Sequence, residues 1–123
     1  MTSDSRLYHN PRCSKSRAAL ELLRERGIQP RIVAYLEHPP TAAELRALTA
    51  MPGLGVRALV RDGESEYAAL GLGAGSTDDE LIAAMVAHPR LIERPVFVHG
   101  GRAVIGRPPE RVLELLHDDA QPG

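Results

Sequence analysis

The apolar residues near the N-terminus predict a strand, a helix and a second strand. Ala19, Leu20 and Leu23 recur at helical spacing and share one face. Asn10-Pro11 interrupts the chain before this stretch, and Gly27 follows it as a helix C-cap. We therefore expect a strand at Arg6–His9, a helix at Ser14–Arg26 and a strand at Arg31–Leu36.

The middle of the chain has the pattern of a helical block. Thr41 to Glu44 and Thr77 to Glu80 have the Thr-x-x-Glu spacing of a capping box, in which two side chains satisfy the first free N–H groups of a helix. The first box predicts a helix to about Ala50, and the second predicts a helix that ends before Pro89. Between them, two short helices are expected around Val56–Arg61 and Ser65–Leu70.

The C-terminal third predicts a β-hairpin followed by a helix. Gly100-Gly101 is a two-residue turn of the kind that joins antiparallel strands, so Pro95–His99 and Arg102–Ile105 are expected to pair across it. Pro108-Pro109 suits the first turn of a last helix.

The element order is thus β-α-β, a helical insert, a β-hairpin and a final α. A β-α-β unit needs a parallel strand pair, and a hairpin adds an antiparallel pair. This order predicts an α/β protein of thioredoxin-like fold, with a mixed four-stranded sheet, helices on both faces, and Tyr35 and Phe97 in the core on strands. We expect one domain over residues 6–117, with the insert at about 41–90 and flexible tails at 1–5 and 118–123.

Composition narrows the function classes. The chain has 123 residues, 15 basic and 16 acidic, and its formal net charge of −1 argues against a general binder of nucleic acid or membrane surfaces. No apolar run approaches the roughly 20 residues that span a bilayer, and no signal-peptide pattern opens the chain. The histidines His38, His88, His99 and His117 are scattered, so we expect surface or supporting roles for them and no metal site.

Cys13 is the only cysteine, so neither an internal disulfide nor a multi-cysteine zinc site can form, and a reducing, cytoplasmic setting fits best. It lies between the first strand and the first helix, where free N–H groups and the helix dipole stabilise a thiolate. A buried structural cysteine is the alternative, but polar and basic neighbours disfavour it. Positive charge is expected from His9, Arg12, Lys15 and Arg17, and a hydroxyl hydrogen bond to sulfur from Ser16; Asn10, Arg12 and Arg17 are secondary site candidates.

Two familiar cysteine motifs are missing. The position three residues after Cys13 is Ser16, which excludes a Cys-x-x-Cys dithiol, and Ala19 stands where a Cys-x5-Arg phosphatase loop needs arginine. Any disulfide that Cys13 makes must therefore be resolved by a thiol from another molecule.

Three further arginines, Arg61, Arg94 and Arg107, are candidates for an anion pocket. A single arginine is usually a solvated surface residue, but the hairpin would bring Arg94 and Arg107 to one edge of the sheet. Planar guanidinium groups suit tetrahedral oxyanions. Arg94-Pro95 is also a candidate for a cis peptide bond.

Six pieces of sequence, spread in order over nearly the whole chain, match one known family. The first runs from Tyr8 to Arg17 around the cysteine. The others are Tyr35-Leu36-Glu37 with Pro39-Pro40, Val56 to Arg61, Thr77 to Ile82 with His88-Pro89, Glu93-Arg94-Pro95, and Gly106 to Pro109. With these pieces the chain resembles the glutaredoxin-linked arsenate reductases of thioredoxin-like fold, and it is most similar to their shorter housekeeping subgroup.

The resemblance implies an oxidoreductase of arsenic detoxification. In such enzymes the cysteine matching Cys13 attacks arsenate to give a thiol–arsenate ester, glutathione adds, arsenite leaves, and glutaredoxin reduces the mixed disulfide. The residues matching His9 and Ser16 help to hold the thiolate, and those matching Arg61, Arg94 and Arg107 bind the oxyanion. Such chemistry uses glutathione as a co-substrate and requires no bound metal or prosthetic group.

Other functions remain open at this point. A glutathione-dependent thiol oxidoreductase acting on protein mixed disulfides would use Cys13 but leave the three arginines without an oxyanion. An RNA-polymerase-binding redox regulator, which the same family contains, typically uses a Cys-x-x-Cys switch that Ser16 removes here. A non-catalytic relic fits poorly with the intact cysteine and arginines.

Overall fold

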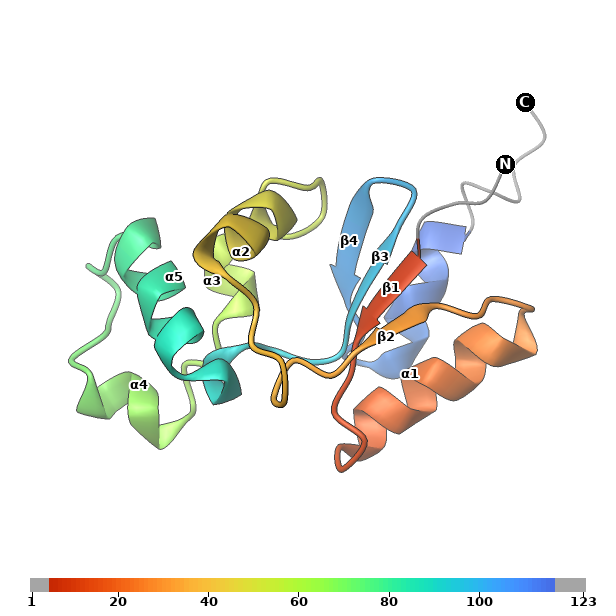
Figure 1. The fold of residues 1–123 in the computed structure, drawn as a ribbon, viewed down its shortest axis with the longest axis horizontal. Helices are drawn as coiled ribbons and strands as arrows, with labels where there is room; N and C mark the ends of the chain where they lie inside the picture. The colour runs from red at the N-terminus through yellow and green to blue at the C-terminus, as the bar shows by residue number, and fades with distance from the viewer. Residues whose placement is uncertain (1–4, 117–123) are drawn as a thin grey trace.

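The computed structural model describes residues 5–116, which are built around a four-stranded sheet in the order β2-β1-β3-β4 (Figure 1). β1 pairs with β2 in parallel, and this pair is joined by α1 (Ser14–Glu25), whereas β1–β3 and β3–β4 are antiparallel. The mixed sheet predicted from the element order is therefore confirmed. The strands are β1 (Ser5–Tyr8), β2 (Arg31–Val33), β3 (Val96–His99) and β4 (Arg102–Ile105).

Alternate residues of the strands pack into two separate hydrophobic cores, one on each face of the sheet. Leu7 and Phe97 pack on one face with α1 and with η2 (Pro109–Leu113). Tyr8 and Val96 point to the opposite face and pack against the helical insert. This two-residue periodicity is the ordinary consequence of strand geometry, and it places helices on both faces of the sheet (Figure 1).

The helical insert lies between β2 and β3. The capping box at Thr77 is complete, since its hydroxyl accepts from the Glu80 N–H at 3.1 Å and the Glu80 carboxylate accepts from the Thr77 N–H at 2.7 Å. At Thr41 only the hydroxyl bond forms, because the Glu44 carboxylate accepts instead from the Tyr8 hydroxyl at 2.7 Å. The insert consists of α2 (Ala42–Thr49), α3 (Val56–Leu59), α4 (Ser65–Ala69), α5 (Asp78–Ala87) and η1 (Pro89–Leu91).

The predicted hairpin is confirmed. Gly100 and Gly101 have φ of 61° and 79°, which is the left-handed pair that a tight two-residue turn requires. The peptide bonds Arg94–Pro95 and Arg107–Pro108, which flank the hairpin, are both cis. The hairpin thus begins and ends next to an arginine.

Three expectations differ from the structure. β2 ends at Val33 because the chain turns there, and the N–H groups of Glu37 and His38 both donate to the Ala34 carbonyl. Tyr35 is buried as expected, but it lies in this turn and not on a strand. His99 is buried, stacks on Phe97 with ring centroids 5.5 Å apart, and is no surface residue.

The third difference concerns the final helix and the ends of the chain. The last helix begins as the 3-10 segment η2, as helix ends often do, and continues in α-helical conformation over residues 114–116. Ser5, expected in a flexible tail, opens β1. The remainder of that tail, the tail at 118–123, and His117 lie outside the described residues. No helix within residues 5–116 is long and apolar enough to cross a membrane.

Gly106 offers a test of how tightly the hairpin is packed against η2. A Cβ atom added there would lie 2.9 Å from both Pro95 Cγ and Val112 Cγ1, and both of these residues are buried. We predict that Gly106→Ala lowers the free energy of unfolding by about 1–3 kcal/mol, the usual cost of overpacking. Gly75→Ala is the matched control, since nothing lies within 4 Å of its added Cβ. Equal urea midpoints for the two variants would contradict the prediction.

Candidate active site

Cys13 lies at the turn from β1 into α1, where it is the N-cap residue of the helix with φ −94° and ψ 122°. Its own N–H donates to the Asn10 carbonyl at 3.0 Å, and the Asn10 side chain accepts from the Arg12 N–H at 3.0 Å, which closes the turn. The thiol is partly exposed and not in a disulfide. The turn therefore presents the sulfur at the open N-terminus of α1.

Two opposing influences act on the pKa of the Cys13 thiol. Partial burial raises the pKa. The backbone N–H groups of Ser16 and Lys15 and the Arg94 guanidinium lower it by more than burial raises it, so the net shift is downward. Hydrogen bonds and positive charge favour the charged form of an acid. The thiolate is consequently favoured relative to a free cysteine.

His9 and Ser16 hold the turn from beneath. Their side chains are buried, and His9 Nδ1 lies 2.6 Å from Ser16 Oγ, which also accepts from the Asn10 N–H at 3.1 Å. Burial, followed by the nearby charges of Arg24 and Arg17, lowers the pKa of His9.

These contacts change two expectations about the turn. Burial lowers the pKa of His9, which disfavours the positive charge expected from this residue. Ser16 acts on the sulfur through its backbone N–H, while its hydroxyl contacts His9 and Asn10. Both residues thus contribute by fixing the shape of the turn.

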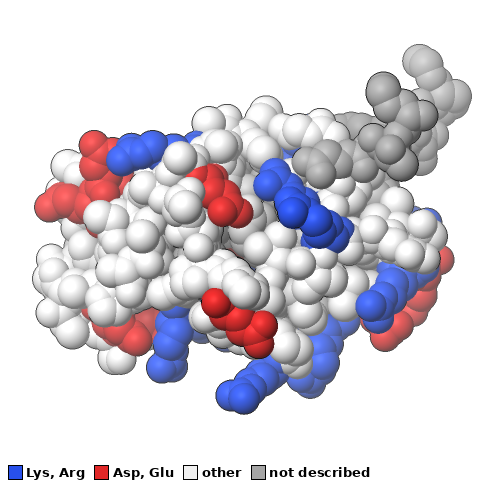
Figure 2. Space-filling model, in the orientation of Figure 1, with Lys and Arg blue, Asp and Glu red and all other residues white. Residues whose placement is uncertain are grey.

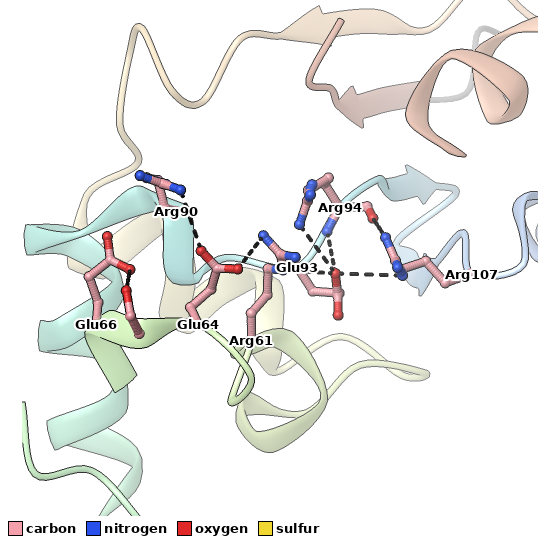
Figure 3. A network of polar contacts seen from close by, with 8 residues as sticks. Arg61, Glu64, Glu66, Arg90, Glu93, Arg94 and Arg107 are labelled. Carbon is pink, nitrogen blue, oxygen red and sulfur yellow. Dashed lines mark hydrogen bonds and ion pairs between the residues drawn. The ribbon is translucent and has the colours of Figure 1, made fainter. Parts of the chain in front are cut away.

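The structure brings Arg61, Arg94 and Arg107 together around one carboxylate (Figure 3). Arg61 follows α3, Arg94 precedes β3 and Arg107 follows β4. Oε1 of Glu93 lies 3.6 Å from Arg61 Nε, 3.9 Å from Arg94 Nη1 and 3.8 Å from Arg107 Nε. These distances exceed those of hydrogen bonds, so Glu93 balances charge without occupying the guanidinium donors.

Arg94 stands out within this group. Its Nε and Nη1 are buried and have no hydrogen-bond partner among the described residues. A buried donor left without a partner costs about 1–3 kcal/mol, so such groups in native proteins usually await a ligand, a water or an ion. The Arg94 guanidinium also lowers the pKa of the Cys13 thiol, so it lies close enough to the sulfur to influence its charge.

A small cleft lies beside Arg61 and Arg94, whereas Cys13 and Arg107 are not among its lining residues. It has a volume of about 190 Å³, which is below the roughly 300–1,000 Å³ of pockets for drug-sized ligands and suits a small anion. Burial raises the pKa of Tyr35 to about 12, so its phenol stays protonated at neutral pH. The cleft is lined by Asn10, Tyr35, Leu36, Arg61, Glu64, Arg90 and Arg94.

Some residues of this region were missed by sequence reasoning. Glu93 stood next to Arg94-Pro95 in the matched pattern, but nothing in its position indicated that it faces three arginines. Glu64 pairs with Arg61 at 3.3 Å and with Arg90 at 3.8 Å (Figure 3), and only its i,i+3 spacing from Arg61 could have suggested a contact.

The secondary candidates have different places. Asn10 lines the cleft and closes the Cys13 turn. The Arg17 guanidinium donates to the Pro11 carbonyl at 2.9 Å and so braces the same turn. Arg12 is exposed and lines a different hollow, on the β2 side of the turn. Within residues 5–116, no group of three or more His, Cys, Asp or Glu side chains is placed to hold a metal ion.

Known proteins place the whole of this architecture in one family. The ArsC family profile matches residues 8–115. The chain belongs to the ArsC family. It is 46% identical over 113 residues to an arsenate reductase of Rhizobium meliloti (strain 1021), covering 91% of this chain and 81% of that protein.

Two further relatives have a similar sequence identity to this chain. The uncharacterized protein YfgD of Escherichia coli (strain K12) is 51% identical over 118 residues, covering 94% of this chain and 99% of that protein. A solved structure, the arsenate reductase from Vibrio cholerae, superposes with a TM-score of 0.85 at 50% identity and covers 89% of this chain and 95% of that one. The Vibrio cholerae protein thus shares the fold over most of this chain.

The influence of Arg94 on the thiol can be measured directly. We predict that the rate of Cys13 alkylation rises with pH around a midpoint below that of a free thiol, and that Arg94→Ala moves this midpoint upward because a stabilising positive charge is lost. Arg46→Ala is the control, since Arg46 pairs with Asp79 at 2.6 Å in an exposed position on the insert. A midpoint that Arg94→Ala leaves unchanged would show that the guanidinium does not act on the sulfur.

Proposed function

We propose that the protein is an arsenate reductase that uses glutathione and glutaredoxin as external thiols. The proposal rests mainly on Arg94, whose Nε and Nη1 are buried without a hydrogen-bond partner and whose guanidinium lowers the pKa of the Cys13 thiol. An oxyanion held on those donors would meet the sulfur directly. The names of the relatives from Rhizobium meliloti and Vibrio cholerae support arsenate as that oxyanion.

In the first step, the Cys13 thiolate attacks arsenate. The sulfur lone pair forms an S–As bond, one As–O bond breaks, and the departing oxygen leaves as water after taking up protons from solvent. Arsenic remains As(V) in the resulting ester. Arg61, Arg94 and Arg107 reduce the repulsion between the two anions and stabilise the charge on the arsenate oxygens.

In the second step, the ester is resolved by glutathione, because the chain has only one cysteine. The glutathione thiolate attacks the Cys13 sulfur, an S–S bond forms, and the S–As bond breaks with its electron pair left on arsenic. Arsenic becomes As(III) and leaves as arsenite, so the two electrons come from the two thiols. Glutaredoxin then reduces the mixed disulfide and returns the Cys13 thiol.

His9 and Ser16 have a positioning role in this scheme. They keep the turn in the shape that aims the backbone N–H groups of Lys15 and Ser16 at the sulfur. Near-neutral overall charge and the mixture of acidic and basic side chains on the face in Figure 2 suit a small local anion site and a cytoplasmic protein. A thiol oxidoreductase acting on protein disulfides would leave the Arg94 donors without a role.

The decisive test is NADPH oxidation coupled through glutathione and glutaredoxin, with arsenate as substrate. We expect arsenate-dependent turnover by the wild-type protein and a loss of roughly a thousandfold or more in Cys13→Ser, because the nucleophile is removed. Far-UV circular dichroism checks that the variant is folded. Substantial residual turnover in Cys13→Ser would exclude the proposed mechanism.

The anion pocket is tested by Arg94→Ala in the same assay. We expect kcat/KM for arsenate to fall by about 10²–10³, as when one electrostatic donor to a transition state is removed. Arg107→Ala, whose side chain is one-third exposed, should have a smaller effect of the order of tenfold. Arg46→Ala should resemble the wild type. Unchanged kinetics in both Arg94→Ala and Arg107→Ala would remove the case for an oxyanion site here.

A further inference from the structure

A second hollow lies on the other side of the Cys13 turn, against the edge strand β2. Its volume is about 480 Å³, within the roughly 300–1,000 Å³ typical of small-molecule sites. One wall is formed by the turn residues Pro11 and Arg12, and the other by Ile32, Leu36 and Glu37. We call this hollow the β2 groove.

The wall of the β2 groove that Ile32 and Leu36 form is apolar and open to solvent. Ile32 and Leu36 are each 42% exposed, and only one other large hydrophobic residue in the described chain, Leu70, is exposed as well. Two of these three residues therefore lie in the same groove. Exposed apolar side chains gathered in a concave site indicate a binding surface.

The rim of the groove has two charged groups of opposite sign. Within residues 5–116, neither the Arg12 guanidinium nor the Glu37 carboxylate forms a hydrogen bond or an ion pair. Arg17, on the same turn, instead donates to the Pro11 carbonyl. Arg12 and Glu37 are thus available to a ligand that has both a carboxylate and an ammonium group.

The β2 groove and the arginine cleft meet at the cysteine turn. Asn10 and Leu36 line both hollows. A molecule lying in the β2 groove would therefore reach the cleft beside Asn10, whose carbonyl accepts from the Cys13 N–H. This continuity joins the groove to the reaction that needs a second thiol.

We propose that the β2 groove binds the thiol co-substrate, a small peptide thiol with both a carboxylate and an ammonium group. Its carboxylate lies on Arg12, its ammonium group lies toward Glu37, and its carbon chain covers Ile32 and Leu36. Its sulfur then points at Cys13 for the S–S bond formation described above. The inference rests on the proposed function, because that function creates the need for an external thiol.

The first experiment detects binding without catalysis. Reduced glutathione is titrated into isotopically labelled Cys13→Ser protein with no arsenate present, and amide shifts are followed by NMR. We expect the shifts to concentrate at Arg12, Ile32, Leu36 and Glu37. Shifts concentrated instead on α5 or on the face of α1 away from Cys13, or no saturable shifts, would overturn the proposal. If glutaredoxin perturbs these amides and glutathione does not, the groove is a protein docking site and the proposal is also wrong.

The second experiment compares two thiols by measuring directly how fast arsenite is released from arsenate, because the coupled NADPH assay reports only on glutathione. Glutathione has the carboxylate and ammonium groups that Arg12 and Glu37 are proposed to bind, whereas 2-mercaptoethanol has no charged group besides its thiol. We expect Arg12→Ala and Glu37→Gln each to lower the preference for glutathione over 2-mercaptoethanol by roughly three- to tenfold, which is the range for partly exposed charge contacts. Arg26→Ala, an exposed arginine at the far end of α1, is the control and should keep the wild-type preference.

The two experiments separate failure of the groove from failure of the proposed function. Arsenate turnover with an unchanged thiol preference in Arg12→Ala and Glu37→Gln would overturn the groove and leave the reductase intact. Glutathione shifts in the groove without any arsenate turnover by the wild-type protein would support the groove and exclude arsenate as the substrate.

Discussion

The site depends on the contact between His9 and Ser16 at the turn from β1 into α1. This buried contact, together with the bond from the Asn10 N–H to Ser16 Oγ, fixes where the strand ends and how the helix begins. Only with that shape do the N–H groups of Lys15 and Ser16 face the Cys13 sulfur. Free N–H groups occur in the first turn of a helix, and the N-cap position of Cys13 places its sulfur next to them.

The arginine group is a product of the whole fold. Arg61, Arg94 and Arg107 come from three elements that are far apart in the sequence, and Figure 3 shows them around Glu93. The bridge between Val60 and Ile92, with the bonds Arg61 N–H to Leu91 and Glu93 N–H to Leu59, ties the end of α3 to the segment before β3. This backbone pairing brings Arg61 close to Glu93 and Arg94.

Local patterns predicted the elements well where one local interaction decides the structure. The Gly100-Gly101 turn and the Thr77 capping box formed as expected because each depends on residues only a few positions apart. Local patterns failed where distant residues compete. The Glu44 carboxylate accepts from the distant Tyr8 hydroxyl and therefore does not complete its capping box. Tyr35 is a separate case, because a local turn closed on the Ala34 carbonyl ends β2 and Tyr35 is buried from that turn.

The sequence by itself determined the order of elements, the mixed sheet, and a lone cysteine at a helix N-terminus, since periodicity and turn residues report on local backbone geometry. The tertiary structure decided which charges act on that cysteine. Burial lowers the pKa of His9, and packing leaves two Arg94 nitrogens without a hydrogen-bond partner. Glu93 faces all three arginines. Burial and charge pairing depend on contacts between distant segments, and no pattern along the chain specifies them.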